Sequence, residues 1–358
     1  MIPGIADIPE RAAGRMTVAG LRGLEPDPEI LEALAGGDLG GVILFSRNYE
    51  SPEQIASLVT RLQEAAPWPL LIAVDQEGGA DQRFRAPFSA LPPMARVGSR
   101  NEVDLAYRVG RLLGAELAAV GVNWNLAPVL DVDTNPANPI IGQRAFGSDP
   151  FLVARLGVAL ARGLEESGVL SCGKHFPGHG DTSEDSHLTR PVLLHDLERL
   201  RRVELVPFAA YAQAGFAALM TAHVLFAALD EIHPATLSAK VLPLLRQEIG
   251  FEGLVVSDGL EMRAVADRYS IEEMVELGVE AGVDTFLFCH DLEKARRASA
   301  RLRQLATGPA RPKLATSLQR LEALCRRFEL PRRPQPAQRI RAILGSEAHR
   351  LVVRECEQ

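Results

Sequence analysis

The chain has 358 residues, of which 47% are hydrophobic, so it can bury the core of one large domain or of two modest ones. Lys and Arg number 39 and Asp and Glu 46, and the resulting net charge of −7 gives no electrostatic reason to bind nucleic acid. The four cysteines are scattered and form no CxxC pair, which indicates neither a disulfide framework nor a thiolate zinc site.

The N-terminal segment, residues 1–15, lacks the basic start and the apolar stretch of a secretory signal. No apolar run approaches the roughly 20 residues that a membrane-spanning helix needs. Even residues 216–229 are interrupted by Thr221 and His223. We therefore expect a cytoplasmic protein that acts as a monomer on a small molecule, without a membrane or nucleic-acid partner.

Short apolar runs rich in β-forming residues alternate with longer segments whose apolar residues have helical spacing. The runs that predict strands are residues 16–21, 41–45, 70–74, 122–126, 169–173, 218–221, 254–257 and 285–288. The segments that predict helices include residues 52–65, 102–119, 151–166, 196–214, 238–249 and 271–282. This alternation is typical of parallel strands joined by crossover helices.

Eight strand-helix units over about 250 to 300 residues match the size of a (β/α)₈ barrel, and an open doubly wound sheet is the alternative. The barrel is favoured because most chemically reactive residues directly follow a predicted strand. Asp75 follows the third run, Lys174 and His175 the fifth, His223 the sixth and Asp258 the seventh. Barrels build their active sites at these strand ends, whereas an open sheet gathers fewer strands at one site.

After residue 307 the pattern changes to an amphipathic helix at 314–328, a connector rich in Pro and Arg at 331–336 and a last helix at 337–344. We therefore predict one catalytic barrel domain over residues 1–307. Residues 308–358 are predicted to form a helical extension that packs on the outside of the barrel. The arginines of this extension are interpreted as a solvated helical face.

The third predicted strand leads into Asp75, which is followed by Gln76, Glu77 and two glycines, with Arg83 behind them. Two acids at a strand end, beside glycines that allow close approach, suit hydrogen bonding to sugar hydroxyls. The alternative is a turn that Asp75 stabilises.

The fifth predicted strand leads into residues 174–187, which read Lys-His-Phe-Pro-Gly-His-Gly-Asp-Thr-Ser-Glu-Asp-Ser-His. Pro177, Gly178 and Gly180 predict a loop, because they break regular structure. Three His, one Lys and two Asp are costly to bury unless paired, so packing alone does not explain them. General acid/base catalysis and a metal site both fit. The segment lacks the two His at i and i+4 of helical zinc sites, but a metal site with scattered ligands stays open.

The seventh predicted strand ends in Asp258, which is followed by Gly259. We expect the Asp258 carboxylate to point into the mouth of the barrel. The alternative is an N-cap for the next helix, which is a common role for Asp after a strand.

Together these motifs resemble the family-3 glycoside hydrolases. The resemblance runs from about residue 16 to residue 291. Within it, residues 123–132, 140–147 and 220–224 also match the family. Its most specific element is the Asp-Ser-His ending of the loop at 185–187, which is similar to the single-domain β-N-acetylglucosaminidases that recycle the bacterial cell wall. One departure lies after Gly79, where the family often has Arg-Val and this chain has Ala80 and Asp81.

The resemblance implies a retaining glycoside hydrolase that needs no cofactor or metal. It would release terminal β-linked N-acetylglucosamine from muropeptide fragments that contain anhydro-N-acetylmuramic acid. Asp258 is then the nucleophile, His187 the general acid/base and Asp185 the partner of His187. The residues implied to contact the sugar ring are Asp75, Arg83, Arg144, Lys174, His175 and His223.

This assignment is chemically coherent. A carboxylate beneath the anomeric carbon stabilises the charge that develops there and traps it as a glycosyl-enzyme. A histidine can supply the leaving-group proton, and an Asp two residues away can fix its tautomer. We also hypothesise that the loop moves over bound substrate.

Three rival functions remain open. The enzyme could transfer the sugar to phosphate, since a neutral histidine repels an anionic acceptor less than a carboxylate would. A metal-dependent hydrolase would use His175, His179, Asp181 and His223 as ligands. The third rival is a sugar-binding barrel without catalysis, against which the set of Asp258, Asp185 and His187 argues.

Overall fold

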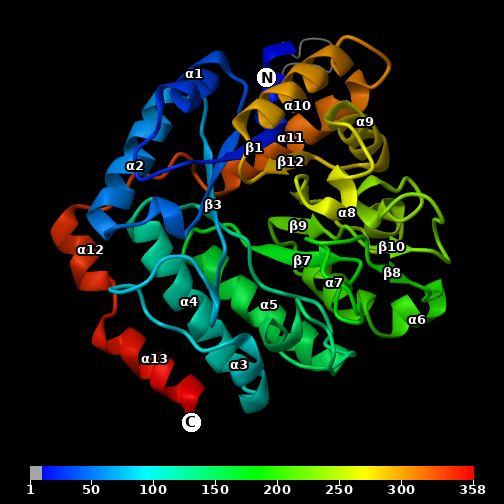
Figure 1. Cartoon of the computed structure of the whole chain (residues 1–358). Helices are drawn as coiled ribbons and strands as arrows, with labels where there is room; N and C mark the ends of the chain where they lie inside the picture. The colour runs from blue at the N-terminus through cyan, green and yellow to red at the C-terminus, as the bar shows by residue number, and fades with distance from the viewer. Residues whose placement is uncertain (1–9) are drawn as a thin grey trace.

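The computed structural model describes residues 10–358, so residues 1–9 of the segment examined for a secretory signal lie outside it. Eight parallel strands form a barrel surrounded by helices (Figure 1), which confirms the predicted (β/α)₈ fold over the open sheet. The barrel strands are β1 (Thr17–Gly20), β2 (Gly41–Leu44), β3 (Leu71–Val74), β6 (Trp124–Asn125), β7 (Cys172–Phe176), β9 (Ala218–Thr221), β11 (Leu254–Gly259) and β12 (Thr285–Phe288). Each coincides with a predicted run to within a few residues.

The barrel closes between β6 and β7, which stand at the two ends of the hydrogen-bonded strand order. Parallel bridges join Trp124 to Leu170 and Val129 to Lys174, and the amide of Leu130 donates to the carbonyl of Lys174 at 2.6 Å. On the opposite side β1 pairs with β12. Because all eight strands run in one direction, their C-terminal ends meet at one mouth.

Helices cover the outside of the barrel, as the predicted alternation requires. They are α1 (Pro28–Gly36), α2 (Pro52–Ala65), α3 (Met94–Arg100), α4 (Val103–Ala119), α5 (Pro150–Glu166), α6 (Leu197–Arg202), α7 (Leu205–Gln213), α8 (Arg263–Ala266), α9 (Ile271–Ala281) and α10 (Leu292–Leu305). Three of them begin with the same signal, a capping Asp or Ser followed by Pro: Asp27 before α1, Ser51 before α2 and Asp149 before α5. Each capping side chain accepts a backbone N–H that the helix leaves free.

Two predicted helices differ from the structure, and a proline explains each difference. The predicted helix at 196–214 is split into α6 and α7 near Val203, where the ring of Pro207 conflicts with a carbonyl one turn earlier. The predicted helix at 238–249 contains Pro243 and is reduced to the π-helical turn η6 (Leu244–Glu248). Of the predicted segment at 174–187, residues Lys174 to Phe176 belong to β7 and not to the loop.

Two small sheets lie outside the barrel. β4 (Gln76–Gly78) and β5 (Asp81–Gln82) form an antiparallel hairpin directly after β3. β8 (Val192–Leu193) pairs in parallel with β10 (Leu225–Phe226). Both sheets extend chain segments that leave the C-terminal ends of barrel strands, so they help to shape the mouth.

The C-terminal region holds three helices, α11 (Arg311–Arg327), α12 (Ala337–Ile343) and α13 (Glu347–Glu357), of which α13 lies beyond the last predicted helix. α12 and α13 lie outside the barrel beside α4 (Figure 1). α11 takes a more specific position, because its Leu321, Leu324 and Cys325 join the cluster of side chains that fills the barrel interior. Among residues 10–358, no helix is long and apolar enough to cross a bilayer.

Candidate active site

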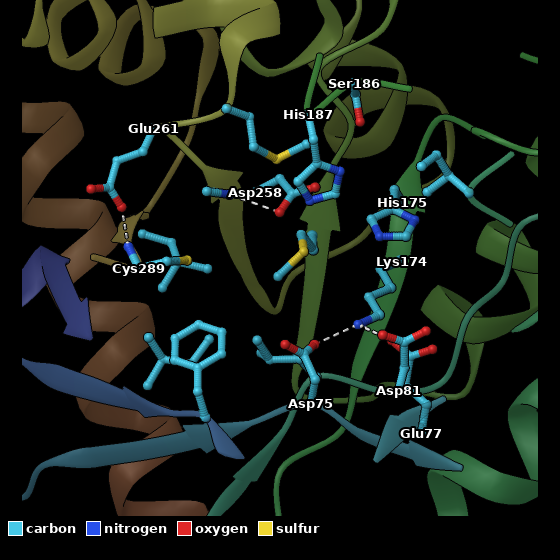
Figure 2. Close-up of a pocket in the computed structure, with 18 of the residues that line it drawn as sticks. Asp75, Glu77, Asp81, Lys174, His175, Ser186, His187, Asp258, Glu261 and Cys289 are labelled. Carbon is cyan, nitrogen blue, oxygen red and sulfur yellow. Dashed lines mark hydrogen bonds and ion pairs between the residues drawn. The ribbon is translucent and has the colours of Figure 1, made fainter. Parts of the chain in front are cut away.

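A cavity of about 290 Å³ opens at the C-terminal ends of the barrel strands (Figure 2). This volume lies at the lower end of the range for small-molecule sites. One wall carries charged side chains from β4, β5 and β7. The apolar and sulfur-containing side chains that line the cavity are Ile43, Phe45, Leu126, Ile140, Met220, Met262, Leu287 and Cys289.

Lys174 is the centre of the charged wall. Its ammonium group lies 2.7 Å from Asp75 and 2.5 Å from Glu77, and Asp75 also faces Arg83 at 3.6 Å. Burial opposes the charge of Lys174, but the two carboxylates outweigh it and raise the pKa of the lysine. Asp75 therefore presents a fixed carboxylate to the cavity instead of stabilising a local turn.

Glu77, which the sequence suggested together with Asp75 as an acid for sugar hydroxyls, is instead a buried partner of two cations. It is 3% exposed, and Arg144 donates to its two oxygens from Nη2 at 2.8 Å and from Nε at 2.9 Å. Burial alone would raise the pKa of Glu77, but Arg144 and Lys174 lower it. The carboxylate thus holds two cations of the charged wall in place. Its partners lie 67 and 97 residues away along the chain, so no local pattern could reveal the pairing.

The chain departs from the family at Asp81, and this side chain joins the charged wall. Its carboxylate lies 3.4 Å from Arg83 and 3.4 Å from Arg144. Asp81 therefore adds a further contact between the two arginines that were predicted to bind the sugar.

His175 lies beside Lys174 on β7 and lines the cavity. Its Nδ1 is 2.7 Å from the buried carboxylate of Asp131, which also accepts the backbone N–H of His179 at 2.6 Å. Burial alone would raise the pKa of Asp131, but His175 and His179 lower it. Asp131 is the residue that the sequence analysis missed in this region, because its role comes from contacts more than 40 residues away. It orients His175 toward the cavity.

Asp258 ends β11 and lines the cavity between His175 on one side and Cys289 on the other (Figure 2). Burial alone would raise the pKa of Asp258, but His175, His223, the amide of Gly259 and Lys174 lower it. The carboxylate is therefore ionised at neutral pH, as a nucleophile requires. The alternative role as a helix cap does not hold, because the next helix, α8, is preceded by Met262 without a side-chain cap.

His223 lies behind Asp258 and does not line the cavity. It is buried, with Nδ1 2.8 Å from the hydroxyl of Thr236 and Nε2 3.1 Å from the carbonyl of Gly259. Both ring nitrogens are thus used within the protein. His223 therefore stabilises the end of β11 through its contact with Gly259. The predicted direct contact of His223 with the sugar does not fit this geometry.

His187 lies on the loop after β7, and its side chain is 62% exposed at the rim of the cavity. Asp185 binds it twice, since the Asp185 carboxylate accepts the backbone N–H of His187 at 2.7 Å and lies 2.9 Å from its Nδ1. The predicted pair thus exists, with Asp185 outside the lining of the cavity and His187 within it.

The four ligands of the rival metal site are engaged elsewhere. Besides the contacts of His175 and His223, the two oxygens of Asp181 bind Thr134 and His195, each at 2.7 Å, and His179 binds Thr182 and Ser186. Among residues 10–358, no group of three or more His, Cys, Asp or Glu is arranged to hold a metal ion. These side chains instead serve the geometry of the loop and of the cavity.

The cavity therefore gathers most of the predicted site residues, which come from distant parts of the chain. It brings together Asp258, His187, Asp75, Arg83, Arg144, Lys174 and His175. A carboxylate faces a histidine paired with a carboxylate, and a charged wall offers donors and acceptors at fixed positions. Such a site can attack an electrophilic carbon and move a proton to the group that leaves.

Comparison with known proteins gives consistent matches. Residues 13–324 match the family model described as the glycosyl hydrolase family 3 N terminal domain. A β-hexosaminidase of Thiobacillus denitrificans is 44% identical over 284 residues, which span 77% of this chain and 79% of that protein. The solved structure of a glycoside hydrolase family 3 β-N-acetylglucosaminidase from Paenibacillus sp. is 37% identical with a TM-score of 0.90, over 98% of this chain and 68% of that one. NagZ from Neisseria gonorrhoeae, solved with N-trifluoroacetyl-D-glucosamine, is 33% identical with a TM-score of 0.80, over 95% and 96%.

Proposed function

Because the chain belongs to glycosyl hydrolase family 3 and is a β-N-acetylglucosaminidase of that family, we propose that it cleaves cell-wall muropeptides by double displacement. It removes terminal β-linked N-acetylglucosamine from fragments in which the next sugar is an anhydro-N-acetylmuramic acid. The muropeptide substrate rests on the resemblance to enzymes of cell-wall recycling and on the likeness to NagZ.

In the first step, an Asp258 oxygen attacks the anomeric carbon while the bond from that carbon to the leaving oxygen breaks. His187 gives a proton from Nε2 to the leaving oxygen, so that the aglycone departs as a neutral alcohol. The products of this step are a glycosyl ester on Asp258 and a neutral imidazole on His187.

In the second step, His187 removes a proton from water, and the water oxygen attacks the anomeric carbon of the ester. The bond to Asp258 breaks, the carboxylate is restored and the sugar leaves with its β configuration retained. Asp185 serves both steps, because its bond to Nδ1 of His187 fixes the tautomer and stabilises the imidazolium.

The charged wall holds the sugar during both steps. Asp75 accepts hydrogen bonds from ring hydroxyls, while Arg83, Lys174 and His175 donate to them. Met220, Met262 and Leu287, which also line the cavity, offer an apolar surface to the C–H faces of the ring. The observation that carries the proposal is the presence of Asp258 and the Asp185–His187 pair at one cavity.

The test compares hydrolysis of an aryl β-N-acetylglucosaminide, the matching aryl β-glucoside, chitobiose and a defined anhydro-muropeptide, each with and without phosphate. We expect the acetamido sugars to react much faster than the glucoside, with free N-acetylglucosamine as product and with the muropeptide preferred over chitobiose. Equal rates on the two aryl glycosides would contradict the sugar assignment. Formation of N-acetylglucosamine 1-phosphate would show instead that phosphate is the acceptor.

A further inference from the structure

Ser186 is a buried residue inside an otherwise exposed stretch of chain. Its neighbours Ser183, Glu184, His187 and Leu188 are exposed, whereas Ser186 is 2% exposed. A hydroxyl that leaves water must find a partner inside the protein, or its burial costs free energy. Ser186 is also the residue directly before the acid/base His187, so whatever holds it acts on His187.

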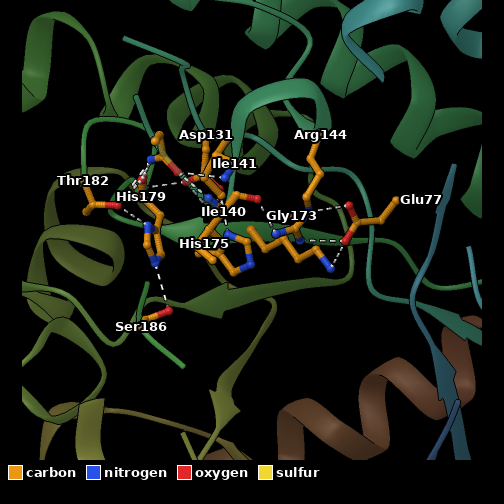
Figure 3. Close-up of polar contacts among 12 residues, drawn as sticks. Glu77, Asp131, Ile140, Ile141, Arg144, Gly173, His175, His179, Thr182 and Ser186 are labelled. Carbon is orange, nitrogen blue, oxygen red and sulfur yellow. Dashed lines mark hydrogen bonds and ion pairs between the residues drawn. The ribbon is translucent and has the colours of Figure 1, made fainter. Parts of the chain in front are cut away.

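Ser186 is held at two points, which lie in the segments that follow two different barrel strands. Its hydroxyl lies 3.1 Å from Nε2 of His179, in the segment that follows β7 (Figure 3). Its carbonyl accepts the backbone N–H of Ala264 at 3.3 Å. Ala264 lies in α8, six residues after Asp258. The backbone of Ser186 thus connects the loop that carries the acid/base to the segment that carries the nucleophile.

His179 is itself fixed on every side. Its amide donates to Asp131, its Nδ1 lies 2.8 Å from the hydroxyl of Thr182, and Asn138 donates to its carbonyl at 2.8 Å. The next residue, Gly180, lies so close to the carbonyl of Val132 that a Cβ would come within 1.9 Å of that oxygen. His179 is therefore held in a fixed position by its hydrogen bonds, ahead of the exposed residues Ser183 and Glu184 of the same loop.

The protonation state of His179 suits this role. The hydroxyl of Thr182 donates to the carbonyl of His179 at 3.1 Å, so its oxygen accepts from Nδ1–H and leaves Nε2 free to accept from Ser186. Burial, with a smaller contribution from His175, lowers the pKa of His179 to about 4. The ring is neutral at physiological pH, as an acceptor must be.

We propose that Ser186 is a positioning residue for the reaction. Its hydroxyl on His179 and its carbonyl on Ala264 fix the backbone that places His187 opposite Asp258. The inference rests on the proposed role of His187 as acid/base. His187 itself is mostly exposed, and within residues 10–358 its hydrogen bonds are both to Asp185, two residues away on the same loop. The contacts of Ser186 are therefore what tie the pair to the rest of the site.

The effect of losing the Ser186 contacts on the rate should depend on the leaving group of the substrate. Proton donation needs His187 at one place, so loosening the loop slows cleavage of a glycoside whose leaving group needs the proton. A dinitrophenolate leaves without protonation, so its departure is insensitive to where His187 stands. A purely structural role of Ser186 would lower both rates alike.

The experiment measures kcat/KM, which reports the first covalent step, on chitobiose and on 2,4-dinitrophenyl β-N-acetylglucosaminide. The variants are Ser186→Ala, His187→Ala and the double variant, with Ser183→Ala as the matched control on the exposed part of the loop. We expect Ser186→Ala to lose about tenfold on chitobiose, as for one hydrogen bond, and less than about twofold on the dinitrophenyl substrate. Ser183→Ala should match the wild type on both.

In the His187→Ala background, Ser186→Ala should cost nothing more on chitobiose, because there is no acid left to position. A further tenfold loss there, equal losses on the two substrates, or a Ser186→Ala variant that behaves like Ser183→Ala would each overturn the proposal. If His187→Ala itself loses nothing on chitobiose, the proposed acid/base is wrong, and that failure is distinct from failure of the positioning role.

Ser186→Thr and His179→Gln provide a second line of evidence. Thr keeps the hydroxyl, and the Gln amide keeps an acceptor near the place of Nε2, so both should retain more chitobiose activity than Ser186→Ala and His179→Ala. Thermal unfolding of each variant shows whether the barrel is intact. Retention of the fold without any recovery by Thr and Gln would count against the hydrogen bond as the cause.

Discussion

At the residue scale, the cavity distinguishes carboxylates that face substrate from carboxylates that organise the wall. Asp258 and Asp75 reach the cavity with part of their surface open, whereas Glu77 is enclosed by Arg144 and Lys174. The pKa values of Asp258 and Glu77 are both lowered, in each case because nearby positive groups outweigh burial. A lowered pKa therefore does not distinguish Asp258, the proposed nucleophile, from the supporting acid Glu77, whereas access to the cavity does.

The first prediction concerns Asp258→Ala. This variant should lose about 10³-fold or more in kcat, because the carboxylate forms the covalent intermediate. It should keep its far-ultraviolet circular dichroism spectrum, since the side chain ends a strand at the edge of a cavity. A 2-fluoro sugar with an activated leaving group should label Asp258 in the wild type, as read by peptide mass spectrometry. A label on Asp75 or Glu77 would contradict the assignment.

The second prediction concerns Glu77→Gln. Removal of this buried charge leaves Arg144 and Lys174 with less compensation, so the free energy of unfolding should fall by about 3 kcal/mol. Urea unfolding measures the change. Glu198→Gln, which breaks an exposed ion pair with Arg202 on α6, is the matched control and should leave the unfolding midpoint unchanged. An equal loss of unfolding free energy in the two variants would show that Glu77 does not stabilise the charged wall.

The third prediction concerns Asp185 and His187 as one unit. His187→Ala should lose about 10² to 10⁴-fold on a substrate with a poor leaving group, the usual range for general acid catalysis. Asp185→Ala should lose part of this, because it leaves the ring without its partner at Nδ1. The double variant should resemble His187→Ala alone. Losses that multiply would mean that Asp185 has a separate role, such as holding the loop.

At the scale of the elements, the segment after β7 combines a rigid first part with an exposed second part. Residues 177–180 are buried and bound to Asp131 and Asn138, whereas most of residues 183–189 are exposed. The proposed catalytic pair of Asp185 and His187 lies in the second part. The first part is the fixed segment to which Ser186 is bound through His179.

The fourth prediction concerns pH and His179. The pKa of His179 is lowered from 6.5 to about 4 in the folded protein, mainly by burial and by His175, while Asp131 and Asp258 act in the opposite direction. Between these values the unfolded chain binds a proton that the folded chain does not. The stability that neutral His179 contributes is therefore full above pH 6.5 and is lost as the pH falls toward 4.

Urea unfolding at pH 7 and pH 4.5 checks this prediction. The wild type should lose more stability on acidification than His179→Gln does, by an amount that approaches about 3 kcal/mol. His233→Gln, which changes a histidine bound to Tyr269 away from the cavity, is the control and should behave like the wild type. A wild type and a His179→Gln variant with the same pH dependence would exclude His179 as the origin of the loss.

Helices and strands could be predicted where a short stretch of sequence carried the pattern that determines them. The strand runs were visible because both faces of a barrel strand are buried, which leaves a continuous apolar run. β7, Cys172–Phe176, was predicted three residues too early, at 169–173, because Lys174 and His175 near its end are polar and look like loop. The helical spacing at 196–214 and 238–249 continues through Pro207 and Pro243, so the apolar pattern predicted longer helices than these prolines allow.

The residues of the site likewise divide into those that a local motif indicated and those whose role depends on distant contacts. Asp258, Asp75 and the Asp185–His187 pair could be named because they stand in short motifs that resemble those of a known family. The pairing of Glu77 with Arg144 and the role of Asp131 could not be predicted, because each residue acts through partners more than 40 residues away that only the fold brings near. The sugar contact of His223 was implied by the same resemblance, but the direction of its side chain is set by Thr236 and Gly259.

At the scale of the whole molecule, the C-terminal helices play two different parts. α11 completes the barrel interior, and Asp284 ties it there by accepting hydrogen bonds from Ser317 at 2.6 Å and Arg320 at 3.0 Å. α13 lies outside, where His349 binds the buried carboxylate of Glu116 on α4 at 2.9 Å. The boundary predicted at residue 307 therefore lies ahead of a helix on which the barrel depends.

The fifth prediction compares two truncated chains. A chain that ends at residue 345 lacks α13 and should fold and turn over substrate with a lower unfolding temperature, since it loses the burial of Val352 and Cys356. A chain that ends at residue 307 also lacks α11 and should be insoluble, because Leu321, Leu324 and Phe328 no longer cover the interior. Soluble yield, thermal unfolding and activity measure both. An active, soluble chain of 307 residues would contradict this account of α11.

The place of α11 also affects how the protein is made. β1 has one neighbour, β2, soon after synthesis, but its other neighbour, β12, and the cover provided by α11 come nearly 300 residues later. At roughly 5 to 20 residues per second, the ribosome needs about 15 to 60 seconds to deliver them. All residues of the cavity have left the ribosome before the interior is closed to water. During that interval the nascent chain exposes the apolar ends of its strands, so chaperones that bind such chains have a defined period in which to act.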